Sequence, residues 1–338
     1  MPNSEDYGFV VGIDDYKKEP YSRLEGARLD AKEFYKWLRD PRGGDVPKEN
    51  IRPFARLSDR SGRMPTFTDL SVLLMQELRA RAPEKKKRIG RRLYLFLAGH
   101  GVNPKGEFDD AGLITVEAGG NYPIYLPSKQ SADDLCFSVR FEEVLLFMDC
   151  CRVPDLLLAP FRIPNDEKPD SGAHKVKRFY AFATGFGQLA RERSHEGVVR
   201  GIFSRILLDG LKGAAPPDSL GRLTTTQLSA YLRTEMNKIV IAGEPLSPKI
   251  LAPDEIVIVE GVPPKLTAVH LTLSQRNADI EVLDGGNNFA IVEPRELTQT
   301  SNGIRFSLPY GRSYAVRAPS LGRTELIRAD QEEVHVTL

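Results

Sequence analysis

The feature that most constrains the fold is a series of short apolar runs separated by polar segments. The runs occupy residues 7–13, 93–98, 144–148 and 179–184. A continuous apolar run of this length is typical of a strand that is buried on both faces of a parallel sheet. Residues 51–57 give a weaker strand pattern of the same kind.

Amphipathic patterns between and after these runs predict helices. They cover residues 30–38, 66–82, 202–211 and 225–239. Strand and helix patterns alternate throughout residues 7–241, and this order is typical of an α/β fold. The sequence therefore predicts an α/β/α sandwich around a mostly parallel sheet.

Two of the predicted strands end in reactive side chains. The run at 93–98 leads into His100, which has a glycine on each side, and the run at 144–148 leads into Asp149 and two cysteines. The carboxyl ends of parallel strands lie at one edge of a sheet, where open α/β sheets bind ligands. We therefore expect the imidazole and a thiol to meet there as an acyl-transfer pair.

The two adjacent cysteines, Cys150 and Cys151, have two interpretations. Free cysteines are among the most buried residue types, so both could fill the core. Adjacent side chains on extended backbone point to opposite faces, so only one thiol is expected to face His100. We predict that Cys151 is the nucleophile and that Cys150 has a supporting role.

Charge and cysteine usage exclude several classes of protein. The chain of 338 residues has 47 Lys and Arg against 46 Asp and Glu, so no global field favours nucleic acid or a membrane. The basic run at 85–92 contains no aromatic residue and is interpreted as a solvated loop rather than a nucleic-acid site. Three cysteines make no disulfide framework.

No metal site or membrane segment is predicted. Five scattered histidines and a thiol pair without a CxxC spacing do not make a zinc site. Asp109 and Asp110 do not match a calcium loop and are interpreted as solvated acids. We expect no cofactor. Since no apolar run is long enough for a bilayer, we expect a cytoplasmic protein without a membrane partner.

Two polar segments interrupt the strand pattern. Residues 103–134 are rich in Gly, Pro and Asp and are expected to form a long loop. Residues 154–177 are expected to be exposed and open to proteolysis. The basic residues of the second segment are the candidate processing sites: Arg162, Lys168, Lys175 and Lys177.

The C-terminal part has a different pattern. Several prolines between residues 245 and 264 indicate a boundary, and short strands with Gly and Asn turns follow. The predicted domains are 1–258, which is α/β, and 264–338, which is a small all-β sandwich. We interpret the second domain as a packing or partner-binding appendage.

Four motifs together carry a family resemblance. They are LEGARLDA at 24–31, AGHG at 98–101, MDCC at 148–151 and ATGFGQLARE at 183–192. In this order they resemble the caspase and metacaspase-like cysteine peptidases, including prokaryotic caspase-like proteins, over residues 7–259. The separation of 51 residues from His100 to Cys151 (151 − 100) fits the spacing of caspase-type proteins.

The resemblance implies a role for each matching residue. His100 would be the general base, and Cys151 would be the nucleophile that forms a thioester. The amides of Gly101 and Cys151 would form the oxyanion hole. Cys150 occupies the position where metacaspases commonly carry Ser, which implies a supporting place in substrate binding.

The resemblance also implies a specificity. Leu24 occupies the position where we would align an arginine of caspases, whereas Asp30 and Asp149 match the acids of metacaspases. Two carboxylates favour a basic side chain, so we predict cleavage after Arg or Lys. Two alternatives are that Asp30 only satisfies helix-start amides and that the specificity is for Asp, as in caspases. Ala98 replaces the Ser usual in metacaspase pockets.

Two classes of function follow from the resemblance. The first is an active endopeptidase that acts on protein substrates, is made as a zymogen and is controlled by an activating protease or a regulatory protein, as in bacterial defence. The second is a catalytically silent adaptor or scaffold. The presence of both His100 and Cys151 favours the endopeptidase. Some metacaspases need calcium, but no clear site for it is present.

Overall fold

The chain divides into two compact units in the computed structural model. One unit is Met1–Leu208 with Thr224–Val259, and the other is Asp209–Leu223 with Glu260–Leu338. The domain boundaries predicted from the sequence, 1–258 and 264–338, stay a prediction. The two compact units differ from these boundaries, because residues 209–223 belong to the unit that contains the C-terminal part. The structure describes residues 3–16, 20–54, 65–74, 88–104, 110–119, 124–155, 170–185, 189–195, 197–218, 221–241, 243–261, 266–274, 278–286, 288–300 and 303–338.

A six-stranded sheet forms the centre of the first unit, in the order β15-β9-β7-β3-β1-β2. All neighbouring strands are parallel except β15, which is antiparallel to β9. This mostly parallel sheet confirms the predicted α/β class. The strands are β1 (Asp6–Gly12), β2 (Ile51–Phe54), β3 (Gly90–Ala98), β7 (Phe141–Asp149), β9 (Lys177–Phe182) and β15 (Lys249–Leu251).

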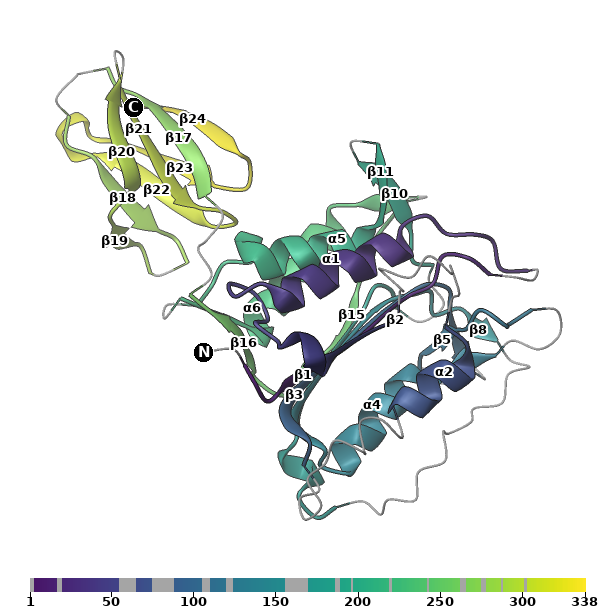
Figure 1. Cartoon of the computed structure of the whole chain (residues 1–338). Helices are drawn as coiled ribbons and strands as arrows, with labels where there is room; N and C mark the ends of the chain where they lie inside the picture. The colour runs from purple at the N-terminus through teal and green to yellow at the C-terminus, as the bar shows by residue number, and fades with distance from the viewer. Residues whose placement is uncertain are drawn as a thin grey trace. The chain divides into compact units, whose positions relative to one another are not determined.

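Helices cover both faces of this sheet (Figure 1). One face carries α1 (Ala27–Arg39), α5 (Ile202–Asp209) and α6 (Thr225–Asn237), and the other carries α2 (Phe67–Val72) and α4 (Ser128–Phe137). Burial on both faces explains why the strands are almost continuously apolar instead of alternating.

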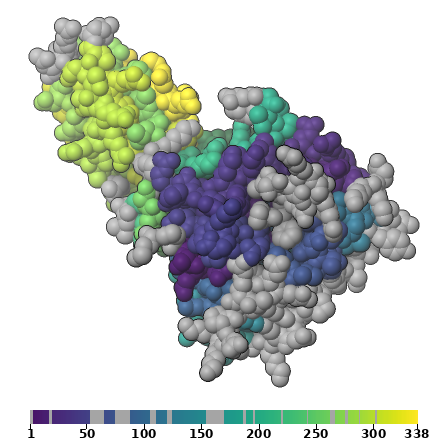
Figure 2. All heavy atoms as spheres, viewed as in Figure 1, coloured from purple at the N-terminus to yellow at the C-terminus, as the bar shows by residue number. Residues whose placement is uncertain are grey.

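Successive side chains along each central strand point alternately to the two helix layers. On the α1 face, the ring of Phe34 stacks on Phe96 of β3 with centroids 4.5 Å apart. On the other face, Leu95 and Leu146 belong to one core cluster with Leu70 of α2. The α1 helix also forms part of the surface, and N-terminal segments coloured purple to blue make much of the visible coloured surface of the first unit (Figure 2).

Smaller elements lie around the main sheet. A second sheet has the order β6-β5-β4-β8, and β10 and β11 form an antiparallel hairpin. Their bounds are β4 (Gly101–Pro104), β5 (Gly112–Ile114), β6 (Tyr125–Leu126), β8 (Pro154–Asp155), β10 (Glu192–His195) and β11 (Val198–Gly201). The chain has further short elements, of which η4 belongs to the second unit: η1 (Lys48–Asn50), η3 (Ala173–Lys175), η4 (Gly210–Ala214), β12 (Arg222–Thr224), β13 (Val240–Ile241), β14 (Glu244–Pro245) and β16 (Val257–Glu260).

The expectation of a long loop at 103–134 was wrong, because this segment contains β5, β6 and most of α4. Polar residues on the buried side of α4 hide its helical pattern. The hydroxyls of Ser128 and Ser131 are buried and donate to the carbonyls of Leu126 and Pro127, at 3.0 and 2.7 Å. Serines satisfied in this way pack inside without adding to the apolar pattern.

The second unit contains two four-stranded sheets, in the orders β20-β21-β17-β24 and β19-β18-β22-β23. Its core includes Val269, Phe306 and Val316. The sequence did not indicate β20 and β23, because nearly all of their residues are exposed and show no alternation. The strands are β17 (Leu266–Thr272), β18 (Glu281–Asp284), β19 (Ala290–Val292), β20 (Arg295–Thr300), β21 (Gly303–Pro309), β22 (Ser313–Ala318), β23 (Arg323–Arg328) and β24 (Glu333–Thr337), with the turn η5 (Pro319–Leu321).

In the part of the chain that the structure describes, no helix has the length and apolar character needed to cross a bilayer.

Candidate active site

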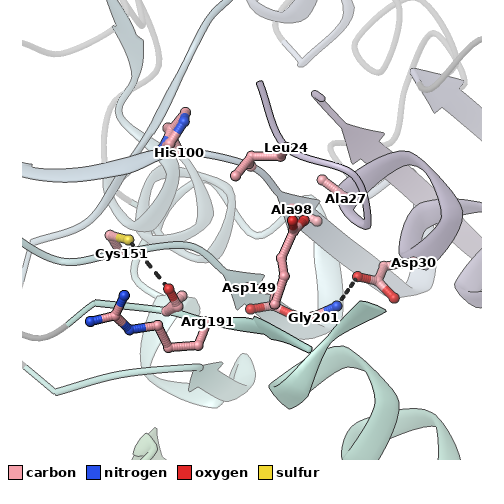
Figure 3. A pocket seen from close by; sticks show the side chains of 12 residues that line it. Leu24, Ala27, Asp30, Ala98, His100, Asp149, Cys151, Arg191 and Gly201 are labelled. Atoms are coloured by element: carbon pink, nitrogen blue, oxygen red, sulfur yellow. Dashed lines mark hydrogen bonds between the residues drawn. The ribbon is translucent and has the colours of Figure 1, made fainter. Parts of the chain in front are cut away.

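The register of two central strands brings the predicted site residues to one edge. β3 and β7 pair Ala98 with Asp149, and the amide of Gly99 donates to the carbonyl of Asp149 at 3.3 Å. His100 and Cys151 each follow two residues beyond the paired positions. Both line one pocket of about 70 Å³ (Figure 3). The lining residues are Leu24, Ala27, Asp30, Ala98, Gly99, His100, Asp149, Cys151, Ala190, Arg191, Glu192 and Gly201.

Three residues from the segment after β1, Tyr16, Tyr21 and Ser22, contact His100. Its amide donates to the Tyr16 hydroxyl at 2.8 Å, and its Nε2 lies 2.8 Å from the carbonyl oxygen of Ser22. The rings of Tyr16 and Tyr21 lie 4.8 and 5.6 Å from the imidazole. Because a carbonyl only accepts, Nε2 carries the proton of the neutral ring and Nδ1 keeps its lone pair.

The glycines on both sides of His100 are required by contacts. Gly99 has a φ of +152°, and a Cβ there would lie 2.6 Å from the Tyr16 hydroxyl. A Cβ at Gly101 would lie 2.3 Å from the carbonyl oxygen of Cys151 and 3.2 Å from its amide nitrogen. The two strand ends therefore meet through their backbones.

The Cys151 thiol is half-buried and donates to the carbonyl of Ala190, at 3.9 Å. Burial raises the pKa of this thiol, and the nearby Asp149 charge raises it further. The resting thiol is therefore protonated at neutral pH. Within the described residues, no hydrogen bond joins it to His100, and in Figure 3 the two side chains point in different directions.

Cys150 faces away from the pocket. Its side chain is 1% exposed, belongs to the hydrophobic cluster under the sheet and lies 3.6 Å from the carbonyl of Leu97. This placement differs from the predicted part in substrate binding, because successive residues of extended backbone point to opposite faces. A contact between Cys150 and a bound substrate therefore does not fit this structure.

The two predicted carboxylates, Asp30 and Asp149, lie on either side of Gly201. A Cβ at Gly201 would fall 2.0 Å from Asp149 Oδ2 and 2.9 Å from Asp30 Oδ2. The backbone amide of Gly201 donates to Asp30 Oδ2 at 2.8 Å, and the Arg200 guanidinium pairs with Asp30 Oδ1. Ser204 donates to Asp149 Oδ2 from its amide at 3.0 Å and from its hydroxyl at 2.6 Å.

Burial raises the pKa values of both carboxyl groups. The pKa of Asp30 is raised to about 7, first by desolvation and then by the Asp149 charge, while Arg200 acts in the opposite direction. Desolvation also raises the pKa of Asp149 to about 6, against the hydrogen bonds from Ser204. The carboxyl groups of Asp30 and Asp149 therefore take up protons at pH values close to neutral.

A third acid at the pocket, Glu192, was not predicted. Its carboxylate accepts the amides of Glu25 and Gly26 at 3.0 and 2.8 Å, which fixes the start of β10 to the segment before α1. Asp14 caps the same helix start by accepting the Arg28 amide at 2.7 Å. Because these contacts join segments far apart in sequence, no local pattern indicates them.

Of the remaining predicted residues, those that the structure describes lie apart from the pocket. Lys175 and Lys177 are exposed, in η3 and at the start of β9. Arg162, Lys168 and Asp109 lie outside the described residues. The carbonyl of Asp110 accepts from the side chains of Asn103 and Arg152. The described residues contain no group of three His, Cys, Asp or Glu side chains arranged to hold a metal ion.

Comparisons with known proteins give similarities to a curated relative and to solved structures. A curated protein named "Probable protease", from a Desulfuromonadales bacterium, is 26% identical over 222 residues, or 62% of this chain. The matched region spans only 26% of that relative's length. The crystal structure of caspase-1 from Spodoptera frugiperda matches with a TM-score of 0.48 and 11% identity, over 77% of this chain and 91% of that chain. No family model matches.

Proposed function

We propose that this chain is a cysteine endopeptidase of the caspase and metacaspase-like type that cleaves proteins after Arg or Lys. The observation that carries the proposal is one pocket lined by His100, Cys151 and the buried carboxylates of Asp30 and Asp149. Similarity to a relative named as a protease supports the same class of activity.

His100 is suited to be the base. Its Nε2–H is held by the Ser22 carbonyl, so Nδ1 is the atom that takes the thiol proton of Cys151. The thiolate attacks the scissile carbonyl carbon, and the imidazolium returns the proton to the leaving amine as the C–N bond breaks. Water, deprotonated by the same imidazole, then hydrolyses the thioester and releases the acid and the free thiol.

The backbone contact between Gly101 and Cys151 supports an oxyanion hole formed by their two amides. Such donors are aimed at the charge that develops on the carbonyl oxygen, and each lowers the barrier by roughly 3–4 kcal/mol where this has been measured. Neither amide needs a side chain, which is consistent with glycine at position 101.

The charges around the pocket favour a basic substrate over an acidic one. Three carboxylates, from Asp30, Asp149 and Glu192, line it, while the lining cation Arg191 is exposed. Arg200 is already paired with Asp30. A buried carboxylate that meets the cation of a substrate gains an ionic partner, whereas an acidic side chain would add repulsion.

The resting state supports control of the activity before catalysis. The Cys151 thiol is protonated and bonded to the Ala190 carbonyl instead of to His100. Catalysis therefore requires the thiol to turn toward the imidazole, which substrate binding, processing at the segment around 154–177 or a partner would favour.

Cleavage of fluorogenic peptides that end in Arg, Lys or Asp tests the proposal. Wild type should release the fluorophore after Arg and Lys, Cys151→Ala should be inactive, and Cys136→Ala is the matched control because that buried thiol lies on α4. Turnover after Asp alone would overturn the specificity. Absence of any turnover, also after limited proteolysis and with calcium, would favour the adaptor.

A further inference from the structure

The outer face of one sheet in the second unit carries an apolar row. Successive residues of its strands point alternately toward the core and away from it. The inward residues, such as Val282, Val316 and Ile327, form the core of the unit or pack against it. The register sets four outward residues side by side in the strand order β19-β18-β22-β23 (Figure 1): Ile291, Leu283, Ala315 and Leu326.

The two ends of this row are the most exposed part of it. Leu326 is 75% exposed and Ile291 is 65% exposed, the two highest values among the large hydrophobic side chains that the structure describes. Between them, Leu283 is half-buried, and the short side chain of Ala315 is buried. An apolar row that crosses a whole sheet face is typical of a surface that binds another protein, because its burial is favourable.

Charged and aromatic side chains lie in the rows on either side. On one side, Glu281 of β18 pairs with Arg317 of β22, and their half-exposed side chains form an ion pair. On the other side, Arg328 lies two residues beyond Leu326 and is exposed at the β23 edge. The exposed ring of Phe289, directly before β19, would lie 3.7 Å from a Cβ at Gly285.

The apolar row is complementary to itself. Two copies can pack face to face about a two-fold axis that runs parallel to the strands, between β18 and β22. Such an axis exchanges the two edge strands, so Leu326 of one copy lies opposite Ile291 of the other. It also exchanges the two central strands, so the large Leu283 lies opposite the small Ala315.

The flanking rows match under the same axis. Glu281 of one copy comes opposite Arg317 of the other, and Arg328 comes opposite the Phe289 ring. Opposite charges attract, and a guanidinium over an aromatic face is favourable. A two-fold axis across the strands would instead set Arg317 opposite Ser313, which has no charge. The charge pattern therefore favours the axis parallel to the strands.

We propose that the outer face of the β19-β18-β22-β23 sheet binds the same face of a second copy of this chain, about a two-fold axis parallel to the strands. Four strands about 4.8 Å apart and three rows about 7 Å apart cover on the order of 400 Å² per copy. This is about half the area of a standard interface, so the dimer should dissociate in the micromolar range. The proposal does not depend on peptidase activity.

Sedimentation velocity of the full chain tests the surface. Wild type should change from monomer to dimer between about 1 and about 200 µM. Leu326→Glu places a charge in the apolar row and should stay monomeric over this range. Leu297→Glu is the matched control, because Leu297 is also exposed, at 55%, but lies on β20 of the other sheet, and it should dimerise like wild type. Circular dichroism checks that each variant is folded.

Charge exchange tests the axis. Glu281→Arg brings two cations opposite each other across the interface, and Arg317→Glu brings two anions together, so each variant alone should dimerise at least about tenfold more weakly than wild type. In an equal mixture of the two variants, every facing pair has opposite charges, and heterodimers should form. Both variants lack the ion pair within the copy, so heterodimer formation reports the contact between copies.

Each outcome bears on the proposal. It is overturned if wild type stays monomeric, if Leu326→Glu dimerises like wild type, if Leu297→Glu weakens the dimer equally, or if the mixed charge variants do not associate. Heterodimers in the mixture, with monomers for each charge variant alone, support both the surface and the axis.

Discussion

Gly101 and Cys151 lie in backbone contact across the ends of two strands, and there is no room for a side chain between them. A Cβ at Gly101 would approach the Cys151 carbonyl oxygen to 2.3 Å and the Cys150 Cβ to 2.6 Å. Both groups belong to the strand end that carries the proposed nucleophile. Any side chain at position 101 must therefore move Cys151.

We expect Gly101→Ala to lower kcat with Arg peptides by about 100-fold or more, because small displacements of a reacting group are costly. Gly172→Ala is the matched control, since a Cβ there would meet only the Asp170 carboxylate, at 3.3 Å, and the Val139 side chain, at 3.8 Å. Steady-state kinetics with circular dichroism as a folding check measures both. Full activity of Gly101→Ala would contradict the proposed oxyanion hole.

The raised pKa of Cys151 predicts how the thiol reacts in the absence of substrate. Burial favours the neutral thiol, so the thiolate fraction should increase with pH. The rate of Cys151 alkylation by iodoacetamide should rise about tenfold per pH unit from pH 6 to 8 without levelling off. Mass spectrometry separates this label from Cys136 and Cys150, which are buried. A plateau below pH 7 would instead indicate a preformed thiolate–imidazolium pair.

The raised pKa of Asp149 predicts the pH dependence of stability. Its pKa is about 6 in the folded state, against a usual value of 3.8, because of burial. Between these values the folded protein binds more protons than the unfolded chain, so this group makes the free energy of unfolding fall as pH rises, by about 1.4 kcal/mol per unit of pKa shift. The loss of stability that Asp149 causes should be complete at pH values above the pKa of this group in the folded state.

Asp149→Asn removes this titration. The free energy of unfolding of the variant, relative to wild type, should therefore increase from pH 4.5 to 7.5 and then stay constant. Urea unfolding at several pH values measures the difference. If the free energy of unfolding of the variant relative to wild type does not change with pH, or decreases as the pH rises, the Asp149 carboxylate is not destabilised by burial in the folded state.

A buried ion cluster stabilises the opposite end of the sheet. Arg92, 2% exposed, pairs with Glu143 and donates to the carbonyls of Val257 and Ile258. We expect Arg92→Met to lower the free energy of unfolding by about 3 kcal/mol, because it leaves buried acceptors unpaired. Arg88→Met, which breaks an exposed pair with Glu142, should cost less than about 1 kcal/mol. Equal effects in urea unfolding would contradict this difference.

The sequence predicted the strands that are buried on both faces of the central sheet. Apolar runs such as 93–98 identify central strands because both faces pack against helices. It did not predict β20, whose six residues are all exposed, or α4, whose buried serines bond to the backbone. In these elements packing is not reflected in an apolar pattern.

The candidate site was predictable only in part. Strand order and motif resemblance indicated His100, Cys151, Asp30 and Asp149, and the pocket brings these four side chains together. The Ser22 carbonyl, the Tyr16 hydroxyl, Glu192 and Arg200 were missed, because their roles arise from contacts between segments distant along the chain. Every residue has a backbone carbonyl, so the contact of the Ser22 carbonyl with His100 cannot be predicted from residue types.

Covalent labelling with an irreversible peptidyl ketone that ends in arginine, with the label located by tandem mass spectrometry, tests most directly whether Cys151 is the nucleophile of a peptidase with basic specificity. We predict a single label on Cys151, formed much faster than with the aspartate ketone of equal length and suppressed in His100→Ala. Labelling of Cys136 or Cys150 in place of Cys151 would contradict the proposed nucleophile, and faster labelling by the aspartate ketone would contradict the proposed specificity.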